Sequence, residues 1–462
     1  MILNERDQLK LIDVRAPALR MLLVVPVVLA LVGSWYAGRW YIGDVVAEYA
    51  PGMESGAIEM AQWTTTLAPD DPLTHWTVAS LEKQVLPPEQ WAEALRQYEE
   101  AVSLSPNDYR LWVDLGRARE QAGDRAGGEK ALRRAVELAP VYAEPRWLLG
   151  NVLLRAGRPE EAFAELQLAA DQDPRLRPQI FNMAWYVFGQ DVEAISRAAG
   201  NSPATRADLV TYLMGRQLLD DALGQWNGLA ASDKTAQRAV GLALMRALLD
   251  GKRFHAAFKI YSDIDPKGAS GIKPGQIANG GFESDIGLSE ENPFDWRVRS
   301  LPQAQVGLDE RYRRSGNRSL RILFQAPGPL IFNTIGQAVL VEPSTAYRLE
   351  FYARTTDLKS ASTPLIEIQE GADRSVLASS APLPVGTNEW QSMTLNFKTG
   401  PKTEAIFIAT NRSACDTGGE AACPIFGTVW YDDFNLQRGA TDAPAQQGRR
   451  ADAGRASVQG AR

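Results

Sequence analysis

Residues 107–140 read NDYRLWVDLGRAREQAGDRAGGEKALRRAVELAP, and this stretch decides the fold. Its apolar and small residues recur at the spacing of one helix face, first over 111–118 and again over 131–138. Gly123 interrupts the first pattern, and Pro140 ends the second. The stretch therefore predicts two helices joined by a tight turn.

The same pattern returns every 34 residues along the chain. Proline recurs in one phase, leucine in a second and alanine in a third, at Pro72, Pro106, Pro140 and Pro174, at Leu81, Leu115 and Leu149, and at Ala101, Ala135 and Ala169. Such a period is typical of stacked helix–turn–helix units, which present an extended surface to partners and seldom carry chemistry themselves. Beyond Pro174 the phase weakens while the helical pattern continues, so we expect an α-solenoid over residues 58–265.

Here the chain resembles the tetratricopeptide repeat family, whose pattern calls for Trp, Leu and Gly, then Ala, a large residue, Ala and Pro. The first block supplies Trp112, Leu115, Gly116, Gly128, Leu132, Ala135 and Pro140. Neighbouring blocks match with departures, because Glu82 replaces the Gly and Trp147 is shifted by one. The resemblance implies a solenoid that binds a protein partner through polar residues of its concave helices, such as Asn151 or Arg155.

The composition argues against two classes of function, nucleic-acid binding and catalysis. The net charge of −7 and the pI near 5.3 argue against nucleic acid as the main partner, because phosphate binding needs a concentrated basic face. The chain has only two histidines, His75 and His255, about 180 residues apart. A zinc site or a Ser-His-Asp triad is therefore not expected, and we predict that the protein is not an enzyme.

Met21 to Gly38 form 18 residues without a charge. Aromatic residues cluster at the far end of this run, and the first 20 residues carry one more basic than acidic side chain. We therefore expect a cytoplasmic arm over 1–20 and a single transmembrane anchor over 21–42, which would place the bulk of the chain in the periplasm or another extracytoplasmic space. A cleaved signal peptide and a buried core helix are the two alternatives.

The amino-acid composition changes at residues 266–276, where glycine, proline and lysine indicate a linker. Short β-rich runs such as SLRILFQA and YRLEFYART then alternate with turns as far as residue 437. We expect an antiparallel β-sandwich or jelly roll over 277–437, followed by a disordered tail over 438–462. The fold class is thus multidomain, α and then β.

This segment resembles the jelly-roll carbohydrate-binding modules with a galactose-binding-like fold. The resemblance rests on Asn279-Gly280-Gly281-Phe282-Glu283, on the run from Ser315 to Ile322, and on the closing strand from Val429 to Phe434. It implies a structural calcium held by Glu283 with Asp432 or Asp433, because hard oxygen ligands suit Ca²⁺. The alternatives are that these acids cap turns, lie in solvent or form a glycosidase pair.

Sugar binding uses exposed aromatic rings, and the candidates are Phe294, Trp296, Tyr312 and Trp390. Phe294 and Trp296 share one face of an extended segment, which is equally the pattern of a core strand. The fold alone does not establish sugar binding, because one fold serves many functions.

Cys415 and Cys423 are the only cysteines, eight residues apart with two glycines between them. They are expected to close a short loop with a disulfide, which implies an oxidising compartment.

Together these features predict a membrane-anchored scaffold of the cell envelope with no cofactor other than structural calcium. The solenoid would hold a protein partner, and the sandwich would dock on glycan or on another subunit beside polysaccharide synthesis or export machinery. The first alternative is a protein-only assembly factor, and the second is a glycan hydrolase built on the sandwich.

Overall fold

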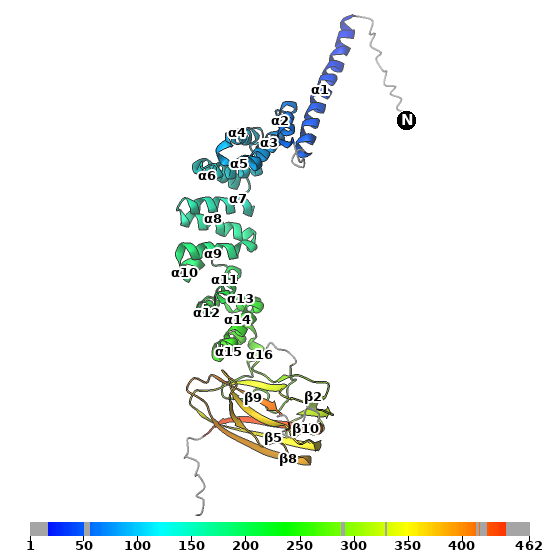
Figure 1. Cartoon of the computed structure of the whole chain (residues 1–462), viewed down its shortest axis with the longest axis vertical. Coiled ribbons are helices and arrows are strands. Elements are labelled where there is room, and N and C mark those ends of the chain that lie inside the picture. The colour runs from blue at the N-terminus through cyan, green and yellow to red at the C-terminus, as the bar shows by residue number, and fades with distance from the viewer. Residues whose placement is uncertain are drawn as a thin grey trace, which may run out of the picture. The chain divides into compact units, whose positions relative to one another are not determined.

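A computed structural model describes residues 17–49, 56–287, 292–328, 330–412, 415 and 423–439. Most of the expected arm over 1–20 and nearly all of the expected tail over 438–462 lie outside the described residues. The chain divides into two compact units, residues 1–208 and 209–462, and each is described by itself (Figure 1).

The first unit is helical. Its elements are α1 (Pro17–Tyr49), α2 (Ala57–Leu67), α3 (Pro72–Val85), η2 (Pro88–Gln90), α4 (Ala92–Leu104), α5 (Tyr109–Gln121), α6 (Arg125–Leu138), α7 (Ala143–Arg155), α8 (Pro159–Gln172), η3 (Pro174–Leu176), α9 (Arg177–Phe188), α10 (Val192–Ala199) and the start of α11 (Pro203–Gly215). Helices α3 to α8 pack as consecutive pairs, and α5 with α6 is the pair expected from the sequence.

Glycines set how closely the paired helices approach. A Cβ atom at Gly116 on α5 would lie 2.7 Å from Leu132 Cγ on α6, and one at Gly150 on α7 would lie 2.6 Å from Leu166 Cγ on α8. Both leucines are fully buried. Asp108 caps the start of α5 by accepting a hydrogen bond from Arg110 N. The 34-residue period is thus a period of close helix contacts.

Helix α1 departs from the expected anchor. It runs through to Tyr49, and its last turns pack on protein: Arg39 donates to the carbonyl oxygens of Thr66 and Leu67, and Ala47 is buried. None of the helices in the described part of the chain has the length and apolarity needed to cross a membrane. The structure therefore does not support a transmembrane anchor over 21–42, and the end of that segment belongs to the helical unit.

The second unit combines helices with two sheets. It holds the end of α11, then α12 (Leu219–Asn227), α13 (Ala231–Ala236), α14 (Arg238–Asp250), α15 (Phe254–Ile264) and α16 (Pro266–Ala269), followed by β1 (Arg297–Val298), β2 (Ala304–Asp309), β3 (Ser319–Ala326), β4 (Ile335–Leu340), β5 (Ala346–Lys359), β6 (Leu365–Glu370), β7 (Val376–Ser379), β8 (Gly386–Lys398), β9 (Ala405–Asn411) and β10 (Ile425–Arg438). Helix α16 occupies the start of the expected linker.

The strands form two five-stranded antiparallel sheets, as expected for a β-sandwich. The first sheet has the order β1-β4-β9-β6-β7 and the second β2-β3-β10-β5-β8. Alternate residues of both sheets share one core, which includes Phe351, Ile408 and Tyr431. We refer to this part of the chain, residues 277–439, as the β domain.

Helix α15 covers part of the first sheet on the side away from that core. The Phe254 ring meets the Phe407 ring of β9 edge-on, with 5.9 Å between centroids, and His255 N donates to Glu404 at 3.0 Å. Phe258 likewise meets Phe294 edge-on at 5.2 Å. The last expected solenoid helix is therefore a cover for the β domain and lies in the same compact unit.

Candidate functional site

A polar ladder joins the first helices of successive repeats, α3, α5 and α7. The Trp76 indole N–H on α3 donates to Asp114 Oδ2 on α5 at 2.7 Å. Glu120 on α5 accepts from the Arg155 guanidinium on α7, with 2.8 Å between Nε and Oε1. The ladder, named here the first-helix ladder, consists of Trp76, Lys83, Asp114, Arg117, Glu120 and Arg155.

Two cations lie together on this ladder. Burial lowers the pKa of Lys83, and the neighbouring Arg117 lowers it further against the opposing effect of Asp114. Arg117 is exposed, and its guanidinium is 4.0 Å from Glu144, the long edge of an ion pair. A carboxylate from a partner would relieve the repulsion between these two cations.

The sequence pointed to Asn151 and Arg155 as contact residues. Asn151 Nδ2 donates to Trp147 O within its own helix at 2.8 Å, so its amide is partly occupied inside the repeat. Arg155 belongs to the ladder. The cations at Lys83 and Arg117 were missed, although both stand at the same place in the 34-residue period and an alignment of the blocks reveals them.

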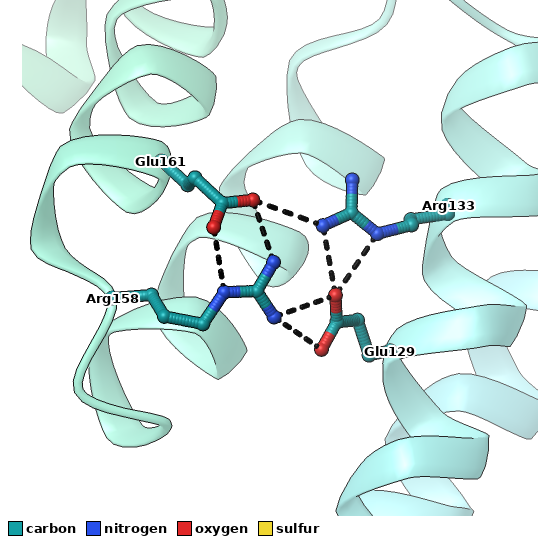
Figure 2. A network of polar contacts seen from close by, with 4 residues as sticks. All are labelled: Glu129, Arg133, Arg158 and Glu161. Atoms are coloured by element: carbon teal, nitrogen blue, oxygen red, sulfur yellow. Dashed lines mark hydrogen bonds and ion pairs between the residues drawn. The ribbon is translucent and has the colours of Figure 1, made fainter.

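A second network joins the later helices of two repeats (Figure 2). Glu129 on α6 accepts from Arg133 on the same helix and from Arg158, which precedes α8, at 2.8 to 2.9 Å. Glu161 on α8 accepts from Arg158 at 2.6 and 2.7 Å and from Arg133 at 3.3 Å. The four side chains close a ring of two acids and two bases. This ring fixes α6 against α8 and leaves little charge free for a partner.

A shallow hollow of about 500 Å³ lies next to that ring on α6. It is bordered by Trp112, Lys130 and Arg134. The Trp112 indole N–H is already bonded to Pro106 O at 3.0 Å, so the hollow offers an apolar ring with a charged rim. Most of its charged side chains are already paired within α6, Arg133 with Glu129 and Arg134 with Glu137, so it is not taken as a contact site for a partner.

The histidines take packing roles in the described structure. The His75 ring nitrogens face Gln97 Oε1 at 2.6 Å and Pro69 O at 2.9 Å. His255 contributes its backbone N–H to Glu404. Neither ring is paired with a nucleophile among these contacts.

Two of the four aromatic residues expected to bind sugar are core residues. Phe294 and Trp296 are 1% and 3% exposed. Phe294 contacts Phe258 and Tyr261 of α15, whereas Trp296 packs on Phe282. The Trp296 indole N–H donates to Asn279 O at 3.1 Å. These two rings are not available to a ligand, which is the alternative that the sequence left open.

The other two aromatic residues remain partly exposed. Tyr312 packs at 4.9 Å against Trp430 of β10 and lies beneath the Arg354 guanidinium. Trp390 is half-buried on β8, an edge strand of the second sheet. The pair therefore keeps some accessible ring surface on the second sheet.

The acids expected to bind calcium converge on Gly281. A Cβ atom there would lie 3.6 Å from Asp433 Oδ1, 3.9 Å from Asp432 Oδ1 and 3.9 Å from Glu283 Cγ. No group of three or more His, Cys, Asp or Glu side chains in the described part of the chain is arranged to hold a metal ion.

Hydrogen bonds already occupy these carboxylates. Glu283 accepts from Asn317 N and Arg318 N, which hold its pKa below the usual range. Asp432 accepts from Arg314 N and Asp433 N, and Arg314 Nη1 lies 2.6 Å from Asp433 Oδ2.

Together these acids hold residues 314–318 against the second sheet. The Arg314 guanidinium supplies the positive charge that a calcium ion would bring, so Glu283, Asp432 and Asp433 do not fit calcium well. Burial raises the pKa of Asp432 to about 6.

Cys415 and Cys423 form a disulfide with 5.7 Å between their Cα atoms. The buried Arg412 side chain donates to Cys423 O at 2.8 Å and to Ser362 O at 2.9 Å. Cys423 is thus tied to the end of β9.

A larger hollow, of about 570 Å³, lies on the first sheet. Arg297, Arg299 and Arg374 line it together with Phe407. Sequence reasoning missed this site because its arginines come from separate segments, and only the sheet order brings them together.

The repeat signal is also found by comparison with known proteins. A family model described as tetratricopeptide repeat matches residues 89–140 and 113–176. No curated protein matches the chain.

Solved structures match separate parts of the chain. One described as CBM4 is 16% identical and covers 35% of this chain and 99% of its own, with a TM-score of 0.26. PilF of Pseudomonas aeruginosa is 14% identical over 50% of this chain and 95% of its own, with a TM-score of 0.29. MamA of Desulfovibrio magneticus is 13% identical over 41% and 92%, with a TM-score of 0.28. At these scores the likenesses carry no statement about function. Residues 89–176 of this chain are tetratricopeptide repeats, of the kind that serves as a scaffold for protein–protein interaction.

Proposed function

We propose that this protein is a scaffold outside the cytoplasm, working beside machinery for polysaccharide synthesis or export. Its repeats hold a protein partner, and its β domain holds glycan or a second subunit. The first-helix ladder carries the protein-binding part of the proposal, because it places the exposed Arg117 and the half-buried Lys83 on neighbouring repeats.

The chemistry of the ladder favours an acidic partner segment. Among the described residues, the ion pair of Arg117 is the 4.0 Å contact with Glu144, and both side chains are exposed. Such an exposed pair contributes little to stability, so exchanging it for a partner carboxylate costs the fold little. A guanidinium binds a carboxylate through two parallel hydrogen bonds, which also fixes orientation.

The location outside the cytoplasm is supported by the Cys415–Cys423 disulfide. Disulfides persist in oxidising compartments and are rare in the cytosol. Glycan binding is supported by the ring surface that Tyr312 and Trp390 keep on the second sheet. The burial of Phe294 and Trp296 instead favours the second candidate, a protein-only assembly factor.

The experiment that tests the protein-binding part is affinity capture from an envelope extract with the purified full-length chain. Arg117→Glu reverses the charge on the ladder, and Arg134→Glu makes the same reversal on α6, away from the ladder. We expect one specific partner that wild type and the Arg134→Glu variant retain and that Arg117→Glu loses. Equal retention by both folded variants would remove the ladder from the proposal.

A further inference from the structure

The basic hollow on the first sheet is built from three cations of two segments. Arg297 lies in β1 and Arg299 directly after it, with the core residue Val298 between them, so both arginines point away from the core. Arg374 lies in the turn between β6 and β7. All three side chains line the same hollow of about 570 Å³.

Within the described residues these three arginines have no acidic ion-pair partner. This sets them apart from arginines such as Arg314, Arg318 and Arg354, which are paired with acids in the same domain. Glu370 and Asp373 lie next to Arg374 along the chain, but their carboxylates accept from backbone N–H groups of the same turn, Glu370 from Ala372 and Asp373 from Ser375. Among the described residues, the hollow therefore concentrates positive charge on a protein whose net charge is −7.

Arg374 is held in place before any ligand arrives. Its guanidinium carbon lies 3.2 Å from the centroid of the Phe407 ring, and its backbone adopts a φ of 63°. Positive φ at a residue other than glycine is strained and is found preferentially at functional sites. Burial lowers the pKa of Arg374, and repulsion from Arg297 lowers it further, so an anion between them would be stabilised by both.

The floor of the hollow lies on two interior strands and includes small residues. Gly336 and Ala338 on β4 lie opposite Ala409 and Phe407 on β9. Thr334 also lines the hollow, and its buried hydroxyl has no hydrogen-bond partner among the described residues. The small residues of the floor let a chain approach the sheet closely.

We propose that this hollow binds a carboxylate-bearing polysaccharide of the uronate type. β4 and β9 each pair with a strand on both sides, so the floor of the hollow cannot add an extended peptide as a further strand. Recognition on the floor therefore depends on side chains. Spaced carboxylates on a sugar chain match spaced guanidinium groups, each through two hydrogen bonds.

This inference rests on the glycan-binding part of the proposed function and names its ligand class. It does not depend on the repeats, because every residue of the hollow lies in the β domain.

The test measures binding of polygalacturonate to the full-length protein, with dextran as the uncharged polysaccharide and poly-L-glutamate as the acidic peptide. The double variant Arg297→Gln/Arg374→Gln removes two cations from the hollow. The control is Arg348→Gln, because Arg348 is an exposed arginine of β5 on the other sheet. Thermal unfolding checks that each variant is folded.

We expect polygalacturonate binding that weakens with added salt, falls by about 100-fold in the double variant and is unchanged in Arg348→Gln. Binding of poly-L-glutamate alone would replace the polysaccharide by an acidic protein segment and overturn the ligand class. Equal binding of dextran, or equal losses in the double variant and the control, would overturn the role of the arginines. Absence of all binding, with partner capture by the repeats intact, would reject this inference while leaving the protein-binding part of the proposed function standing.

Discussion

The repeats and the β domain differ in how far apart in sequence their contacts lie. In the repeats, Gly116 packs on Leu132 of the next helix. In the β domain, Ile322 of β3 lies opposite Val429 of β10, more than 100 residues later. A local contact repeats with the sequence and can be read from its period, whereas a distant contact cannot. The neighbours of a given residue can therefore be predicted from the sequence in the repeats, and much less so in the β domain.

The largest expected effect is a loss of packing in the β domain. Phe351→Ala removes a fully buried ring that stacks on Phe434 at 5.0 Å, so we expect the free energy of unfolding to fall by about 3–5 kcal/mol. Hydrogen exchange followed by mass spectrometry should show faster exchange across the strands and no change over α3 to α8. Phe426→Ala, at a ring that is 41% exposed, is the control and should have a small effect. Faster exchange in the repeats would mean that the two regions unfold together.

A matched change in the repeats should act locally. Leu132→Ala opens a cavity beneath Gly116, and we expect a loss of about 2–5 kcal/mol in the helical transition. Exchange should rise in α5 to α8 and stay unchanged in the β domain. Leu168→Ala, at a side chain that is 44% exposed, is the control. A uniform effect along the whole chain would contradict the comparison.

A pH titration and a calcium titration test whether the acids near Gly281, Glu283, Asp432 and Asp433, form a calcium site or only accept hydrogen bonds. The pKa of Asp432 is raised to about 6 in the folded state from 3.8, so its contribution to stability is full below 3.8 and is lost as pH rises through 6. The melting temperature of wild type relative to Asp432→Asn should therefore rise as pH falls from about 7 to about 4.5.

Adding Ca²⁺ should leave the melting temperature of wild type unchanged, because Arg314 already neutralises Asp433. A pH-independent difference would contradict the raised pKa. A clear stabilisation by Ca²⁺ that Asp432→Asn abolishes would instead establish the calcium site expected from the sequence.

The smallest effect is expected from the ring of ion pairs in Figure 2. Glu129→Gln leaves Glu161 as the one acid of the ring for both Arg133 and Arg158, so we expect a modest drop in the melting temperature of the helical transition. The drop should shrink at high ionic strength because salt screens partly exposed charges. Glu137→Gln, which breaks the single Arg134 pair, should have a smaller effect. Equal effects at low and high salt would show that packing and not charge is responsible.

The helical repeats and the two sheets could be predicted from the sequence. The candidate sites could be predicted only in part. The period placed the paired helices of the repeats because each helix packs on its sequence neighbours. The alternation of Phe294 and Trp296 was ambiguous, because their burial depends on Phe258 and Phe434, which are distant in sequence. The basic hollow could not be predicted at all, since the order β1-β4-β9-β6-β7 is what gathers its arginines.

The most direct test of the scaffold account is photo-crosslinking in cells with a photoreactive amino acid at position 117 on the first-helix ladder. The same amino acid at position 134 on α6 and at position 348 in the β domain provides the comparison. The account predicts one discrete crosslinked protein at position 117 that is absent at 134 and 348. Crosslinks of equal strength at all three positions, or none at 117 in a folded and expressed protein, would contradict the claim that the ladder holds a partner.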